Sequence, residues 1–80
     1  MGIRETVGDR ILYFCNERNL AVNALARISA VPPSTLKNII SGVSKNPGIV
    51  TIKKICDGLE INIIEFFNTD EFKKLEQEII

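Results

Sequence analysis

Cationic and amide side chains are the residues of this sequence that could do chemistry, and that chemistry is the binding of an anion. The run from residue 18 to residue 56 contains no carboxylate but carries six cations: Arg18, Arg27, Lys37, Lys45, Lys53 and Lys54. Asn38, directly after Lys37, adds an amide that both donates and accepts hydrogen bonds. A surface of one charge sign attracts a polyanion, and this run also contains the apolar spacing of a helix pair between Leu25 and Ile39. The two features together predict DNA binding.

Charge is unevenly distributed along the chain. The 10 cations balance the 10 acids, so the net charge is zero. Residues 1–17 carry a net charge of −1, residues 18–56 one of +6 and residues 57–80 one of −5. The charges alone leave open whether this division is a binding surface or a set of solvated faces. Its coincidence with the helix-pair spacing described below favours a binding surface.

Residue types that enzymes and metal sites use are scarce. The sequence has no histidine, no Cys-x-x-Cys and no glycine-rich phosphate loop, and Cys15 and Cys56 lie among apolar residues as core side chains would. We therefore expect no enzyme activity, no cofactor and no metal. With 80 residues, 45% of them hydrophobic, the chain is typical of one small globular domain. It shows neither a membrane span nor a signal-peptide pattern, so we expect a cytoplasmic protein without a small-molecule ligand domain.

Hydrophobic periodicity predicts an all-α fold with no strand. The spacing of apolar residues, proline, glycine and capping residues predicts helices over residues 4–18, 22–29, 33–41, 49–59 and 63–67, and a tail helix over 70–80. Asn62 with Glu65 resembles a capping box, and Asn68 with Glu71 repeats the pattern. Gly42 is placed to end the third helix in a left-handed conformation.

The second and third of these helices form a pair joined by a tight turn. Leu25, Ala26 and Ile28 are expected to be buried on the first helix of the pair, and Leu36 and Ile39 on the second. Pro32 and Pro33 end one helix and begin the next, since proline is tolerated in the first helical turn but not in the interior.

These residues resemble the Cro and phage-repressor-like helix-turn-helix regulators, also called the XRE type. The likeness covers about residues 7–67 and is carried by an ordered set of positions: Arg10-Ile11, Leu20, Leu25-Ala26, Val31, Leu36, Ile39, Gly42, Asn46-Pro47, Thr51-Ile52, Ile55, Leu59, Ile61 and Glu65-Phe66-Phe67. The resemblance implies a compact five-helix, lambda-repressor-like DNA-binding domain over residues 1–68, followed by a short helical tail over 69–80. It also implies a homodimer on a palindromic operator of double-stranded DNA.

A recognition helix places its N-terminal, outward-facing residues against base edges in the major groove. Counted from the inward Leu36 and Ile39, the outward residues of the third helix are Pro33, Ser34, Lys37 and Asn38. Lysine can donate to guanine, asparagine can pair with adenine and proline can touch a thymine methyl. The alternative is that these side chains merely face water. By family likeness, the expected phosphate contacts are Asn23, Thr35, Ser44, Lys45 and Asn46.

Several positions depart from the family pattern. Ala21 and Val22 stand where a capping Ser or Thr and a phosphate-binding Gln are common, which puts the DNA affinity in doubt. Ala30 and Glu60 stand where turns often carry glycine. Many members place a buried Arg–Glu pair at the positions of Cys15 and Ile40, so we expect these two apolar side chains to pack together here.

The sequence thus predicts a sequence-specific transcriptional regulator, expected to act as a repressor. The alternative is a protein-interaction module, antitoxin-like or anti-repressor, with weak affinity for DNA. The apolar tail stripe, Phe72, Leu75, Ile79 and Ile80, is compatible with either a contact to its own core or pairing with another subunit.

Overall fold

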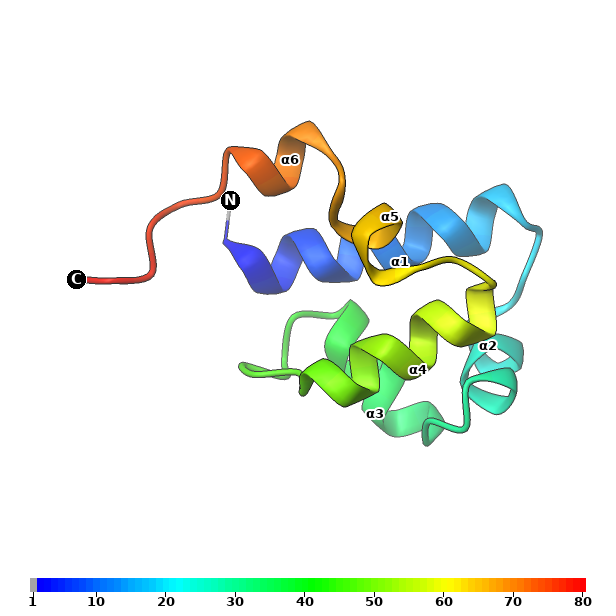
Figure 1. The fold of residues 1–80 in the computed structure, drawn as a ribbon. Coiled ribbons are helices and arrows are strands. Elements are labelled where there is room, and N and C mark those ends of the chain that lie inside the picture. Colours follow the sequence, from blue (N-terminus) through cyan, green and yellow to red (C-terminus); the bar gives the residue numbers. More distant parts are fainter. Residues whose placement is uncertain (1) are drawn as a thin grey trace.

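Residues 2–80 are described by the computed structural model, and their regular structure consists of helices alone (Figure 1). In chain order these are α1 (Ile3–Glu17), α2 (Val22–Ile28), α3 (Pro33–Ile40), α4 (Ile49–Leu59), α5 (Ile63–Phe67) and α6 (Asp70–Lys73). The long helix α1 packs against α3 on one side and against α6 on the other, while α4 packs against α2 and α5 (Figure 1). None of these helices is long and apolar enough to cross a lipid bilayer.

One apolar core joins the first five helices. Ile11, Leu25, Leu36, Ile55 and Phe66 are completely buried, so every one of these helices contributes a side chain that water does not reach. On α4, Ile52, Cys56 and Leu59 are buried as well. Both cysteines are buried as free thiols, as expected for core side chains.

The helix ends follow local signals in the sequence. The expected bounds of α4 and α5 agree with the structure, and Asn62 caps α5 by accepting a hydrogen bond from the Glu65 backbone N–H at 2.7 Å. Gly42, just beyond α3, has a φ of +77°, which is the left-handed conformation predicted for it. A capping side chain fixes one of these ends, and the left-handed backbone conformation that glycine adopts easily fixes the other. Both signals can be recognised in the sequence.

The expected burial of Ile28 is wrong, because this side chain is 59% exposed. Residues four apart share a helix face, and Leu25 is therefore followed on the inward face by Ser29. Ser29 is only 5% exposed, and its hydroxyl has no hydrogen-bond partner among the described residues. The buried position that was expected for Ile28 is therefore filled by the polar side chain of Ser29.

The tail differs from the expected helix over residues 70–80. Helix α6 ends at Lys73, and its cap is Thr69, whose hydroxyl accepts a hydrogen bond from the Phe72 N–H at 3.1 Å, rather than Asn68. Phe72 packs against the Phe67 ring, with ring centroids 4.9 Å apart. Ile79 is 79% exposed. Short helices are marginal without tertiary contacts, and among the tail residues from 70 to 80 only the partly buried Phe72 packs against the core.

Two glycines allow helices to approach closely. A Cβ atom added at Gly8 of α1 would lie 2.5 Å from the carbonyl oxygen of Ile40, at the end of α3. A Cβ atom at Gly58 of α4 would collide with the Ser29 hydroxyl just beyond α2. Gly8 therefore sets how closely α3 lies against α1, although a glycine inside a helix costs stability in its own right.

Candidate nucleic-acid interface

A tight turn fixes the angle between α2 and α3. Ala30, within this turn, has a φ of +56°, and the Val31 N–H donates to the Ala26 carbonyl oxygen at 3.0 Å. The Val31 side chain is buried in the core. Because backbone hydrogen bonds and a buried side chain both hold the turn, α3 has a fixed orientation relative to α2.

The two helices of the pair begin differently. The residue before α2 is Ala21, which has no side chain able to cap the helix, and the expected loss of a cap is confirmed. Helix α3 begins at Pro33, as predicted, with Pro32 as the preceding residue. Proline at the first helical position needs no N–H partner, so α3 begins without a capping side chain.

Helix α3 presents a polar outer face. Leu36 and Ile39 are buried, whereas the four residues expected to contact bases are all exposed: Pro33, Ser34, Lys37 and Asn38. Thr35 is half-buried at the edge of this face. The outer face therefore carries a cation, an amide and a hydroxyl that can reach a partner without any movement of the core.

The loop after α3 is tied to the last turn of that helix. The Ser44 N–H donates to the Asn38 carbonyl oxygen at 3.0 Å, and the Ser41 hydroxyl donates to the same oxygen at 3.3 Å. Ser44 is half-buried, while Lys45 and Asn46 are exposed. These bonds hold Lys45 near the C-terminal end of α3. Asn23, in the first turn of α2, is exposed as well.

Four of the six cations make no ion pair with any residue in the described part of the chain: Arg27, Lys37, Lys45 and Lys54. Lys53 pairs with Asp57 one turn further along α4. Arg18 pairs with Glu17 at 3.6 Å and lies over the Phe14 ring. Helix α6, whose first turn carries Asp70 and Glu71, lies across α1 from α3 (Figure 1). Lys37 and Lys45 are therefore available to an anion.

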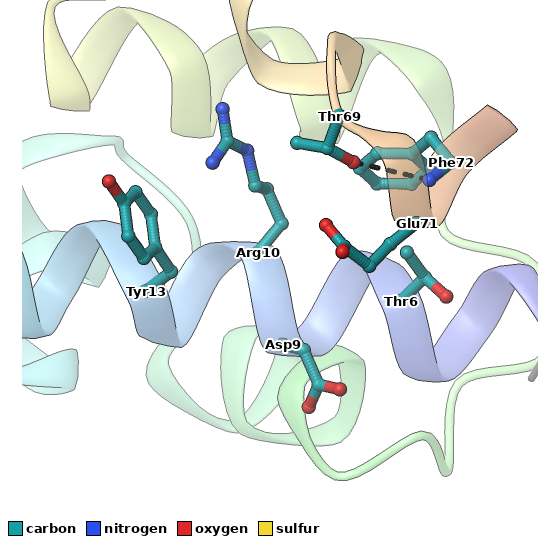
Figure 2. A pocket seen from close by; sticks show the side chains of 7 residues that line it. All are labelled: Thr6, Asp9, Arg10, Tyr13, Thr69, Glu71 and Phe72. Carbon is teal, nitrogen blue, oxygen red and sulfur yellow. Dashed lines mark hydrogen bonds between the residues drawn. The ribbon is translucent and has the colours of Figure 1, made fainter.

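A cleft of about 410 Å³ lies on the α6 side of α1, and Figure 2 shows its lining. Arg10 points into it and donates from Nε to the Phe66 carbonyl oxygen at 2.8 Å and from Nη2 to the Glu65 carbonyl oxygen at 2.9 Å. Its guanidinium also lies 4.4 Å from the centre of the Phe14 ring. Because a cation stabilises the C-terminal carbonyls of a helix, Arg10 holds α5 against α1. Arg10 therefore has a structural role at a distance from α3.

Sequence reasoning missed two residues of α1 that hold other helices in place, Arg10 and Gly8. Arg10 appeared only as part of a family likeness, and nothing in its local pattern indicates acceptors on α5. Gly8 did carry a signal, because a glycine inside a helical pattern often marks close packing. Within the described residues, no group of three or more His, Cys, Asp or Glu side chains is placed to hold a metal ion.

A helix pair whose turn is anchored by the buried Val31, with an exposed polar second helix and unpaired cations beside it, defines a helix-turn-helix DNA-binding protein. The family model of the Cro/C1-type HTH DNA-binding domain matches residues 10–71. The chain belongs to this family, which consists of DNA-binding regulators rather than of enzymes.

Two solved structures share the fold. The prophage Lp1 protein 11 is 29% identical with a TM-score of 0.81, and the match covers 94% of this chain and all of the other. An HTH_3 family transcriptional regulator from Vibrio cholerae is 27% identical with a TM-score of 0.77; the match covers 88% of this chain and 38% of that regulator. No curated protein sequence matches this chain. The protein is a DNA-binding transcription regulator.

Proposed function

We propose that this protein represses transcription by binding as a homodimer to a palindromic operator, with α3 of each subunit in the major groove. The observation that carries the proposal is the exposed face of α3, where Lys37 and Asn38 stand outward from the buried pair Leu36 and Ile39. Two such faces related by a two-fold axis match two half-sites about one turn of DNA apart.

Each outward residue of α3 has a chemistry suited to one kind of base contact. Lys37 donates to the O6 and N7 atoms of guanine, and Asn38 pairs through its amide with adenine. Ser34 donates to or accepts from either kind of base, while Pro33 makes an apolar contact such as one with a thymine methyl. Because Lys37 and Asn38 offer the most selective chemistry, they carry most of the sequence preference.

The proposed phosphate contacts surround α3 on both sides. Lys45 and Asn46 reach the backbone from the loop tied to α3, and Asn23 reaches it from the first turn of α2. Thr35 and Ser44 are half-buried, so their hydroxyls contribute from the edges of the interface. Phosphate contacts position the protein on the duplex without specifying the sequence.

The test begins with selection of bound sequences from a random pool of double-stranded DNA, which reports whether a site exists and whether it is symmetric. Titrations of the selected site then compare Lys37→Ala and Asn38→Ala with the unmodified protein. We expect each variant to lose about 1–3 kcal/mol of binding free energy and to lose preference at its own base pair. The matched controls, Lys74→Ala and Asn68→Ala, change exposed residues outside the helix pair and should bind like the unmodified protein.

A symmetric site with these losses supports the proposal. Binding that is blind to sequence would contradict it and would favour the alternative of a protein-interaction module. Repression itself is tested by placing the selected site within a promoter. Expression should fall in the presence of the protein and recover with Lys37→Ala.

A further inference from the structure

A narrow apolar groove lies beside the proposed phosphate-binding loop. Its volume is about 180 Å³, and it is lined by the start of α1, the loop before α4, the first turns of α4 and the Phe67 ring. Val7 and Ile52 are buried at its base, while Ile3 and Ile49 are 41% and 63% exposed. This volume is below that of ordinary small-molecule pockets, so the groove suits one or two side chains of a protein segment.

The rim of the groove is basic. Arg4, Lys45 and Asn46 line it. Arg4 is partly neutralised by Glu5, with Nε and Oε2 3.6 Å apart, whereas Lys45 makes no ion pair with any residue from 2 to 80. An apolar side chain flanked by a carboxylate is therefore the complementary occupant of this groove.

The chain itself supplies such a segment. After α6, residues 75–80 contain Glu76, Glu78, Ile79 and Ile80 and form no helix, and Figure 1 shows them running away from the body of the molecule. Ile79 is 79% exposed. In an extended segment successive side chains point in opposite directions, so Ile79 can enter a groove while Glu78 stays at its rim.

We propose that this tail docks in the groove of a second copy of the chain, with Ile79 among the apolar side chains and Glu78 beside Lys45. The tail and the start of α1 lie at the same end of the molecule, at the left of Figure 1. Two copies that meet at this end around a two-fold axis therefore exchange both tails, and each contact is made twice.

This exchange would oppose DNA binding, an effect that rests on the function proposed above. Lys45 is the proposed phosphate contact, and a tail carboxylate beside it occupies the position of a phosphate. The tail-exchanged pair is thus a DNA-free form, and it becomes more populated as the protein concentration rises.

The contact is tested without DNA on the full chain. In an equal mixture of isotope-labelled and unlabelled protein, filtered nuclear Overhauser spectra report only contacts between copies. We expect cross-peaks between the Ile79 methyl groups of one copy and the Phe67 ring of another. Contacts within one copy only, contacts to a different surface, or no tail contact at all would each overturn the proposal.

Variants then identify the side chains responsible, with the dissociation constant of the DNA-free pair measured by sedimentation. Ile79→Ser should weaken the pair at least about ten-fold, since it removes a buried apolar side chain from both contacts. The matched control, Ile64→Ser, changes an isoleucine that is 76% exposed and does not line the groove, and it should leave the constant unchanged. Equal weakening by the two variants would contradict the docking.

A charge exchange tests the rim. Glu78→Lys and Lys45→Glu should each weaken the pair about three- to ten-fold, and the double variant should restore it. No restoration would contradict the assigned contact. Binding to the selected DNA is measured last, where Ile79→Ser should tighten apparent binding at concentrations that favour the pair. If the protein binds no preferred DNA, the function proposed above fails while the DNA-free measurements still decide the tail contact.

Discussion

Ala30 holds the turn between α2 and α3 at a backbone angle that glycine adopts at lower cost. Its φ is +56°, and Glu60, beyond α4, has a φ of +58°. The sequence identified both positions because the family often carries glycine there. Asn19 is a third such residue, with a φ of +53°, but asparagine tolerates this region better than alanine does. The strain therefore falls on Ala30 and Glu60.

Ala30→Gly should raise the free energy of unfolding by about 1 kcal/mol, because it removes the Cβ clash of the left-handed conformation. Thermal unfolding followed by circular dichroism should show a melting temperature roughly 4–8 °C higher. The matched control is Ala24→Gly inside α2, where the same substitution should lower stability by about 1 kcal/mol. A loss of stability in both variants would contradict the proposed strain.

The two buried thiols should make stability fall at alkaline pH. Burial raises the pKa of Cys15 and of Cys56 above the ordinary thiol value. A raised folded-state pKa contributes stability that is complete below the unfolded pKa, near 8.5, and is lost as the pH rises through the folded pKa. Urea unfolding between pH 7 and pH 9.5 should therefore show a declining free energy of unfolding. The double variant Cys15→Ala, Cys56→Ala should show a flatter profile, and an equal slope in both proteins would contradict this account.

The replacement of a family ion pair at Cys15 and Ile40 was inferred from the sequence. Cys15 is 4% exposed, and Ile40 is partly buried against the core, so both side chains lie in apolar surroundings. Their direct contact stays a prediction. Two apolar residues at these positions avoid leaving one charge buried without its partner, which is the costly outcome.

At the scale of elements, the fit between α1 and α3 depends on Gly8. Gly8→Ala should lower the free energy of unfolding by about 1–3 kcal/mol, because the new Cβ must push away the Ile40 backbone. The gain in helix propensity, about 1 kcal/mol, offsets only part of this cost, because the Cβ would lie 2.5 Å from a backbone oxygen, which places the cost near the upper end of its range. Gly48→Ala is the control: its Cβ would meet only the Thr51 hydroxyl at 3.9 Å and should change stability little. Denaturant titrations of the two variants measure the difference, and equal effects would contradict the close approach.

Helices were predictable where local chemistry fixes them. Pro33, Gly42 and Asn62 each act within a few residues of their own position, so the beginning of α3, its end and the cap of α5 followed from the sequence. The exposure of Ile28 and the early end of α6 depend on which faces find a partner in three dimensions. The outward residues of α3 were found from their spacing to Leu36 and Ile39. The link from Arg10 to α5 spans the whole domain and leaves no local pattern.

At the scale of the molecule, α3, which carries Lys37, and α6, which carries Asp70 and Glu71, lie on opposite sides of α1 (Figure 1). Lys45→Ala should reduce the slope of log binding constant against log salt concentration by about 0.9, the value for one lost phosphate contact. The control, Lys74→Ala just beyond α6, should leave the slope unchanged. Fluorescence titrations over 50–200 mM salt measure the slopes. Equal slopes for the Lys45→Ala variant and the unmodified protein would show that Lys45 does not contact a phosphate.

The pair of hydrogen bonds that Arg10 donates to α5, here called the Arg10 clamp, has a consequence for the order in which the chain folds. Its acceptors, the carbonyl oxygens of Phe66 and Glu65, come 56 and 55 residues later in the sequence, whereas the helix pair joins residues fewer than twenty apart. A growing chain can therefore bring α2 and α3 together before α5 becomes available, and it can close the clamp only after α5 has emerged. The Arg10 clamp is thus a late and non-local step in the folding of the nascent domain.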